Sequence, residues 1–329
     1  MCNGLYGIKP SWQRIPYSNQ ENGTLPASAK LALPASAGPI AHSLRDCALF
    51  FSAVSAQRPW EVDPDVVPLP YSPSPSSSSS SNNAKEPMTI GIVRTDGLIT
   101  PLPPIARLMD EAASALRAHG GARVVELDIS PLFSRCQTLA NALFGADGGA
   151  HAFALLESTG EPLSPWLAPR LKKKAPLSLE QARELHARKA AMERAFLEVW
   201  RTQGGAGGRV DAFVCPVAPH PVPPVDRWNG VSYTSSFVLL DYPAGTLPVR
   251  DVGPADLKAE LPEGEPLGSW DRANRELWTK ADRSVYLGTP LCVQVVVPKL
   301  REERLLDAMR IVEEALKAEG TGRKERAVL

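Results

Sequence analysis

The stretch MTIGIVRTDGLITPLPPIARLMDEAASALRAHGGARVVELDI (88–129) decides the fold class of this chain. Its two ends, 88–94 and 122–129, are short apolar runs rich in β-branched residues, which is the pattern of buried strands. Between them, apolar side chains recur at helical spacing: Ile105, Leu108, Met109, Ala112 and Leu116. A strand, a helix and a second strand in this order predict a parallel pair joined by a right-handed crossover. The fold class is therefore α/β.

Segments on both sides of this unit add further helices and strands. SLRDCALFFSAVSA (43–56) is typical of a helix, because Ser43 and Asp46 make a capping-box-like pair ahead of a periodic apolar face. The same periodicities predict the remaining elements: helices at about 131–158, 178–202 and after Pro298, and strands at 209–216 and up to Pro298.

Residues 68–88 are rich in proline and serine and include six consecutive serines at 76–81. Such a composition buries too little apolar surface to order itself, so we expect a mobile loop. A phosphorylated Ser/Pro tail is the alternative. A solvated insertion is the favoured interpretation, because a low-complexity segment is recognised by its composition alone.

Composition excludes several classes of protein. The chain has 329 residues, 43% of them apolar, which is enough to fill a core. Thirty-six basic residues balance 36 acidic ones, so no broad field attracts nucleic acid. No apolar run approaches the roughly 18 residues of a membrane span, and the start shows no secretory signal. Five widely spaced cysteines without a CxxC pair argue against disulfides and zinc ribbons and favour a reducing, cytoplasmic location.

Side chains with catalytic chemistry are sparse. Cys215 and His220 follow a predicted strand and suggest a thiol and its base, but a buried strand cysteine and a loop histidine are the favoured interpretation. The histidines are scattered without ligand spacing, so no metal site is predicted. GGAGG (204–208) lacks the glycine patterns of nucleotide-binding loops, so no such cofactor is predicted. Lys172–Lys174 form a docking patch or, as we favour, a solvated surface.

Taken together, seven segments resemble the amidase signature family of serine hydrolases, especially its fungal acetamidase-like members. In family order they are CNGLYGIKPSWQRIPYS (2–18), SAGPIAHSLRDCALFFSAV (36–54), PWEVDPDVVPLPY (59–71), TIGIVRTDGLITPLPPI (89–105), VDAFVCPVAPHPVPP (210–224), SYTSSFVLLDYPAGTLPV (232–249) and GTPLCVQVVVPKLREERLLDAMRIVEEAL (288–316). The resemblance implies a mixed β-sheet core flanked by helices on both faces. It also implies hydrolysis of the C–N bond of small-molecule amides through a seryl acyl-enzyme, with no cofactor.

The resemblance carries no catalytic residue into this chain. Family members have a Ser-cisSer-Lys triad, and their nucleophile segment, which also supplies the oxyanion hole, lies before the equivalent of CNGLYGIKPS (2–11). Lys9 lies on the wrong side of that segment to be the triad lysine. We therefore expect 1–329 to be a partial amidase signature domain whose N-terminal part is missing, inactive alone and self-associating through exposed core. The alternative is a non-catalytic amidase-like remnant with a binding role or no function.

Part of the substrate pocket is expected to remain. In relatives the helix equivalent to SYTSSFVLLDYP (232–243) and the turn after it line the substrate region. Tyr233, Thr234 and Tyr242 are therefore the predicted substrate-binding residues, with ordinary packing as the alternative. Trp228 is a further candidate.

Overall fold

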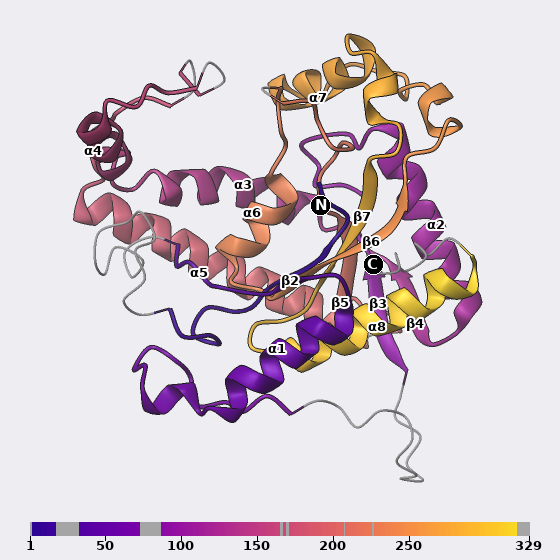
Figure 1. The fold of residues 1–329 in the computed structure, drawn as a ribbon, viewed down its shortest axis with the longest axis horizontal. Coiled ribbons are helices and arrows are strands. Elements are labelled where there is room, and N and C mark those ends of the chain that lie inside the picture. Colours follow the sequence, from indigo (N-terminus) through magenta and orange to yellow (C-terminus); the bar gives the residue numbers. More distant parts are fainter. Residues whose placement is uncertain are drawn as a thin grey trace.

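The structure, a computed structural model, describes residues 2–17, 33–72, 87–164, 167–168, 171–206, 208–225 and 227–320. Most of the predicted mobile loop, residues 73–86, lies outside the described residues. The described strands form one seven-stranded sheet in the order β2-β1-β6-β7-β5-β3-β4 (Figure 1). Their bounds are β1 Tyr6–Lys9, β2 Ile40–Ala41, β3 Met88–Ile92, β4 Ala122–Glu126, β5 Ala212–Pro216, β6 Ala244–Asp251 and β7 Pro290–Val296.

The parallel pair predicted from 88–129 is confirmed. β3 runs parallel to β4, with Ile90 opposite Val124, and α2 (Pro103–His119) connects the two strands. β3 is also parallel to β5 on its other side, where Ile90 lies opposite Ala212. All other neighbours in the sheet are antiparallel, so the sheet is mixed.

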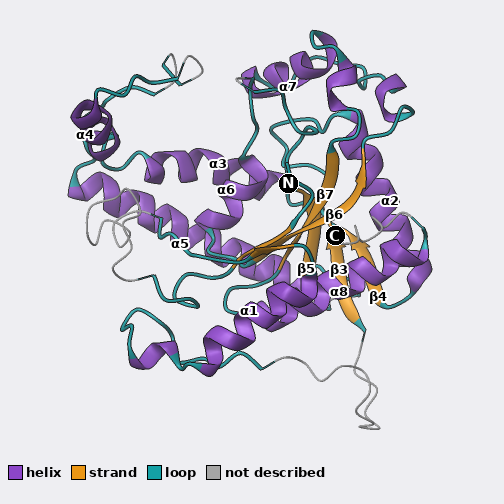
Figure 2. Cartoon of the chain, viewed as in Figure 1, coloured by secondary structure: helices purple, strands orange, loops and turns teal. Residues whose placement is uncertain are grey.

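Side chains that alternate along the strands divide the apolar interior into two cores. In β5, Ala212 and Val214 belong to one core, and Phe213 and Cys215 belong to the other. The first core packs against α1 (Leu44–Ala56), α2 and α8 (Glu302–Ala318); the second packs against α3 (Ser130–Phe144), α5 (Leu179–Thr202) and α6 (Ser232–Leu239). Helices thus cover both faces of the sheet, as predicted (Figure 2).

Capping explains where two of the predicted helices begin. The Ser43 hydroxyl accepts a hydrogen bond of 3.1 Å from the backbone N–H of Asp46 at the start of α1. At the start of α5 the cap is reciprocal, since Gln181 N–H donates to the Ser178 hydroxyl and Ser178 N–H donates to the Gln181 side chain. Both predicted helices are confirmed.

The single helix predicted at about 131–158 is wrong. α3 ends at Phe144, and a separate helix, α4 (Ala150–Thr159), begins after a turn. Gly148 and Gly149 have φ angles of 68° and 77°, which other residues adopt only with strain. A Cβ atom on Gly148 would also lie 2.1 Å from the carbonyl oxygen of Lys174. The glycines therefore break the helix and let the chain before α5 pass close by.

A long excursion between β6 and β7 carries α7 (Ser269–Thr279) and two 3₁₀ helices, Asp256–Lys258 and Arg283–Tyr286; a third 3₁₀ helix is Pro59–Glu61. Buried Asp271 accepts hydrogen bonds of 2.9 Å from the N–H groups of Thr100 and Leu267. Asn274 donates to the carbonyl of Thr100 at 2.8 Å. These bonds fix the segment after β3 against α7. No helix of the described part is long and apolar enough to cross a membrane.

Candidate functional site

The register of the sheet places several segments at one edge. Gly7 pairs with Thr246, Thr246 with Gln294, and Gln294 with Cys215, so these four residues form one row across four strands. Beyond this row the parallel strands β3 and β5 reach their carboxyl ends, and residues 2–5 approach β1 from the same side. Ligands of α/β sheets bind at the carboxyl ends of parallel strands. We refer to this side of the sheet as the carboxyl edge.

Tyr233 joins α6 to the turn after β3 at the carboxyl edge. Its side chain is fully buried, and its phenol oxygen accepts a hydrogen bond of 3.0 Å from the backbone N–H of Asp96. Burial, together with the nearby Asp96 carboxylate, raises the pKa of Tyr233 well above its usual value. The phenol is therefore neutral and acts through hydrogen bonding, not as a base.

Asp96 holds the turn that follows β3. One carboxylate oxygen accepts hydrogen bonds from the N–H groups of Leu98 and Ile99, at 2.8 and 2.9 Å. Burial raises the pKa of Asp96, and the neighbouring Ser232 hydroxyl and the turn N–H groups oppose that rise. A buried carboxyl group thus lies directly behind Tyr233.

Gln294 is a buried polar side chain within the apolar strand β7. Its amide nitrogen donates to the Cys215 sulfur at 3.4 Å and approaches the carbonyl oxygen of Tyr233 at 3.5 Å. Burial raises the pKa of the Cys215 thiol to about 12, so the sulfur stays protonated. A protonated, buried thiol is not a nucleophile.

His220 has partners other than Cys215. Its Nδ1 lies 2.7 Å from the carbonyl oxygen of Pro221, and its Nε2 accepts a hydrogen bond of 2.8 Å from the N–H of Gly230. Burial lowers its pKa to about 4, so the ring is neutral with the proton on Nδ1. His220 thus links Pro221 to Gly230. These contacts support the interpretation of Cys215 as a buried strand cysteine and of His220 as a loop histidine.

The predicted substrate-binding residues lie in different environments. Thr234 is half-buried, and its hydroxyl donates to the Val231 carbonyl at 3.0 Å, within its own helix end. Trp228 packs edge-on against His220, with 5.6 Å between ring centroids, near the carboxyl edge. Tyr242 precedes β6 at the opposite edge of the sheet, where its ring contacts Trp200 edge-on at 5.6 Å.

The structure therefore brings Tyr233, Thr234 and Trp228 toward one edge and leaves Tyr242 apart. Burial raises the pKa of Tyr242 to about 12, in keeping with its place in an aromatic core. A substrate-binding role for these residues stays a prediction. Sequence reasoning did not single out Asp96 or Gln294. Gln294 carried a detectable signal as the one polar residue in the run LCVQVVV (291–297), whereas Asp96 is revealed by its contacts.

A pocket of about 460 Å³ opens beside the turn after β3, on the face covered by α2. Its lining residues are Arg94, Thr95, Thr100, Pro101, Pro103, Ala106, Met109, Asp110, Glu260 and Pro262. Thr95 directly precedes Asp96, whose N–H donates to Tyr233, so this pocket borders the polar group at the carboxyl edge. Its volume lies within the range of ligand sites.

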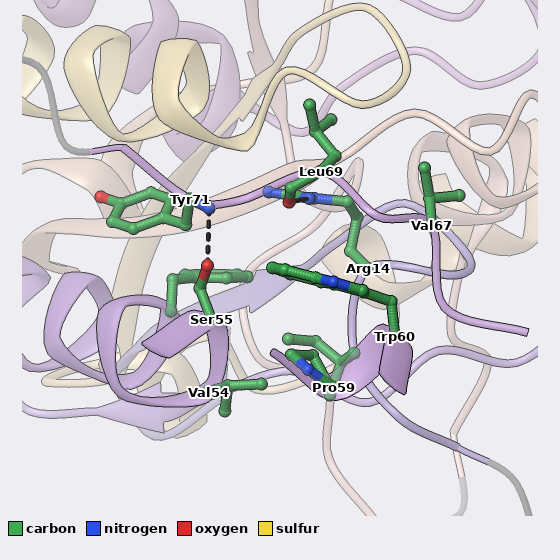
Figure 3. A pocket seen from close by; sticks show the side chains of 10 residues that line it. Arg14, Val54, Ser55, Pro59, Trp60, Val67, Leu69 and Tyr71 are labelled. Atoms are coloured by element: carbon green, nitrogen blue, oxygen red, sulfur yellow. Dashed lines mark hydrogen bonds between the residues drawn. The ribbon is translucent and has the colours of Figure 1, made fainter. Parts of the chain in front are cut away.

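A second gap, between α1 and the chain around Leu69, is too small for a ligand. Figure 3 shows Arg14 reaching past Trp60 toward the backbone of Leu69, whose carbonyl accepts its hydrogen bond. The space left amounts to about 10 Å³, which is at the lower limit for one water molecule. Among the described residues no group of three or more His, Cys, Asp or Glu side chains is placed to hold a metal ion.

Known proteins resemble this chain in both sequence and fold. The Acetamidase of Aspergillus oryzae is 28% identical over 306 residues, which cover 92% of this chain and 54% of that relative. The Acetamidase of Emericella nidulans is 29% identical over 309 residues, with coverage of 92% and 54%. The structure is similar to a fatty acid amide hydrolase with a TM-score of 0.77 and 23% identity, covering 95% of this chain and 53% of that one.

The chain thus spans about half the length of the curated relatives it matches. A sequence profile of the Amidase family matches residues 1–306, which is most of the chain. The mixed sheet with helices on both faces agrees with that match. On these grounds the chain belongs to the Amidase family.

Proposed function

We propose that residues 1–329 form the C-terminal half of an amide hydrolase that cleaves carboxamide C–N bonds through a seryl acyl-enzyme. The observation that carries the proposal is the family match over residues 1–306, which begins with β1 and includes both parallel strands at the carboxyl edge. Residues 2–5 approach β1 at that edge. A nucleophile segment joined to them would therefore lie near Asp96, Tyr233 and Gln294.

In the proposed reaction a serine oxygen attacks the amide carbonyl, the amine leaves with a proton, and water releases the acid from the acyl-serine. Such acyl transfer needs a nucleophile, a proton relay and oxyanion donors held in one geometry. The resemblance implies that all three come from a segment that precedes the stretch matched here, so we propose that residues 1–329 alone are inactive.

This chain would contribute one wall of the substrate site. Tyr233 and Gln294 offer neutral hydrogen-bonding groups in a buried setting, where such bonds orient a ligand more strongly than in water. Thr234 and Tyr242 belong to the proposed substrate-binding set through their place in SYTSSFVLLDYP. A cytoplasmic location is part of the proposal, and it is supported by the five cysteines, none of which is joined in a disulfide.

The test compares the chain alone with a chimera that carries the N-terminal part of the Aspergillus oryzae acetamidase ahead of Cys2. We expect no hydrolysis of acetamide or acetanilide by the chain alone and measurable hydrolysis by the chimera. A chimera whose supplied nucleophilic serine is changed to alanine is the matched control and should be inert. A folded chimera that remains inert on both amides would support the non-catalytic remnant instead.

A further inference from the structure

The pocket beside α2 is a candidate ligand site separate from the amide chemistry. It is formed by the segment after β3, by the first turns of α2 and by residues 260–262 of the α7 excursion. Buried Asp271 and Asn274 fix one of its walls through their bonds to Thr100. Because hydrogen bonds with α7 hold this wall, that side of the pocket is preformed, as small-molecule sites usually are.

The floor and walls of this pocket are mostly apolar and rigid. Pro101, Pro103 and Pro262 contribute three rings that cannot change their backbone φ angle, and Met109 adds a polarisable sulfur. Ala106 lies exposed on the α2 surface within the lining, so the space above it is open. Flat proline faces and a thioether pack well against an aromatic ring.

The charges of the pocket are already paired with one another. Arg94 Nε and one of its terminal nitrogens donate to Glu126 at 3.0 and 3.2 Å, and its other terminal nitrogen donates to Asp110 at 2.6 Å. At the rim, Glu260 accepts from Arg283 at 3.1 Å. A guanidinium whose edge is so occupied offers its planar face, and that face stacks on aromatic rings.

The two lining carboxylates decide the charge of the ligand. Asp110 and Glu260 oppose a single lining cation, Arg94, and that cation is held by carboxylates already. To reach Arg94, an anionic ligand would have to displace Glu126 or Asp110, and it would leave the displaced carboxylate without its partner. A neutral ring meets neither penalty.

From these observations we propose that the pocket lined by Arg94, Pro101, Pro103, Ala106 and Met109 binds a neutral aryl group, such as the ring of an aryl amide. The ring stacks between the prolines and the Arg94 face, and its polar substituent faces Thr95 and the rim. This binding needs no nucleophile, so it can be tested independently of the proposed hydrolysis.

The test is a titration of the 329-residue chain with acetanilide, benzoate and acetamide, followed by ligand-observed NMR and calorimetry. Acetanilide should bind saturably with a dissociation constant on the order of 1 mM, as expected for a ligand of its size. Benzoate should bind at least about tenfold more weakly because Arg94 is already paired with Glu126 and Asp110, and acetamide should not bind measurably.

Ala106→Phe fills the pocket from an exposed position and should weaken acetanilide binding at least about tenfold while circular dichroism stays unchanged. Ala118→Phe, at another exposed alanine of α2 that does not line the pocket, is the matched control and should bind like the unmodified chain. The proposal is overturned if acetanilide shows no saturable binding, if benzoate binds as tightly, or if Ala106→Phe binds as the control does.

Discussion

The phenol oxygen of Tyr233 accepts a hydrogen bond of 3.0 Å from the backbone N–H of Asp96, across 137 positions of sequence. This bond joins α6, the helix predicted to line the substrate site, to the turn that follows β3. The donor is buried, so no solvent replaces the phenol when it is removed. The contact is thus both a structural link and a marker of the carboxyl edge.

Tyr233→Phe should destabilise the chain by about 1–3 kcal/mol, because it leaves the Asp96 N–H buried and unpaired. Urea unfolding followed by circular dichroism measures this change. Thr234→Val removes a half-buried hydroxyl bonded only within its helix end, and it should change stability by less than about 0.5 kcal/mol. Equal free energies of unfolding for the two variants would show that the hydrogen bond of Tyr233 does not stabilise the fold.

Glu302→Ala should be among the most destabilising single changes, at about 3–5 kcal/mol. Glu302 is fully buried at the start of α8, where it accepts from Arg14 Nε at 2.8 Å and from the Ser11 N–H at 2.9 Å. Its loss leaves the Arg14 charge buried without its closest partner. Thermal melting checks the prediction.

Glu180→Ala breaks an exposed pair with Arg183 on α5 and is the control for Glu302→Ala. Exposed pairs contribute little because water and salt screen them. The melting temperature of this variant should match that of the unmodified chain. A similar loss in both variants would contradict the role assigned to Glu302.

Acid should weaken the fold through His220. Its pKa in the folded chain is lowered to about 4 from an ordinary value of 6.5. As the pH falls, the imidazole is therefore protonated in the unfolded chain at a higher pH than in the folded chain. The stabilisation by neutral His220 is complete above about pH 6.5 and is lost as the pH falls toward 4, by up to about 3 kcal/mol. Urea unfolding at pH 7.0, 5.5 and 4.5 should show this loss.

His220→Gln isolates that contribution from the carboxyl groups that titrate in the same range. The variant should be less stable at pH 7.0 and should lose less stability on acidification than the unmodified chain. Parallel pH dependences for the two proteins would show that His220 does not titrate between the folded and unfolded states as assigned.

Local sequence pattern was enough to predict β3, α2 and β4, because the apolar periodicity of each segment indicates its secondary structure. It was not enough at 145–149, where α3 has ended at Phe144 and Gly148 lies against the carbonyl oxygen of Lys174, a contact from another segment. The antiparallel partners of β1 and β7 likewise depend on tertiary pairing between distant segments, as between Gly7 and Thr246 or between Cys215 and Gln294. Spacing in the sequence does not encode such pairings.

The candidate site was likewise predicted only in part from the sequence. Tyr233 and Thr234 were found through the resemblance of SYTSSFVLLDYP, whereas Asp96 and Gln294 join them only because β3, β7 and α6 converge at one edge. Tyr242 shares the same short stretch of sequence, but it lies past the end of α6 in an aromatic core. A motif identifies a segment, and the fold decides which of its side chains share a surface.

The isolated chain should self-associate, since large apolar side chains such as Leu179, Val225 and Leu267 are exposed. Size-exclusion chromatography with light scattering measures its mass. Val225→Glu combined with Leu267→Glu should shift the distribution toward monomer. A monodisperse monomer with a sharp cooperative melt before any substitution would contradict the prediction and favour a self-sufficient binding domain.

Covalent labelling tests the central proposal most directly. A fluorophosphonate should modify the chimera with the acetamidase N-terminal part at one serine, and peptide mass spectrometry should locate that serine in the supplied segment. The same reagent should leave residues 1–329 unmodified, alone and within the chimera. An adduct on a serine of residues 1–329, or amide hydrolysis by the chimera without any adduct, would contradict the account.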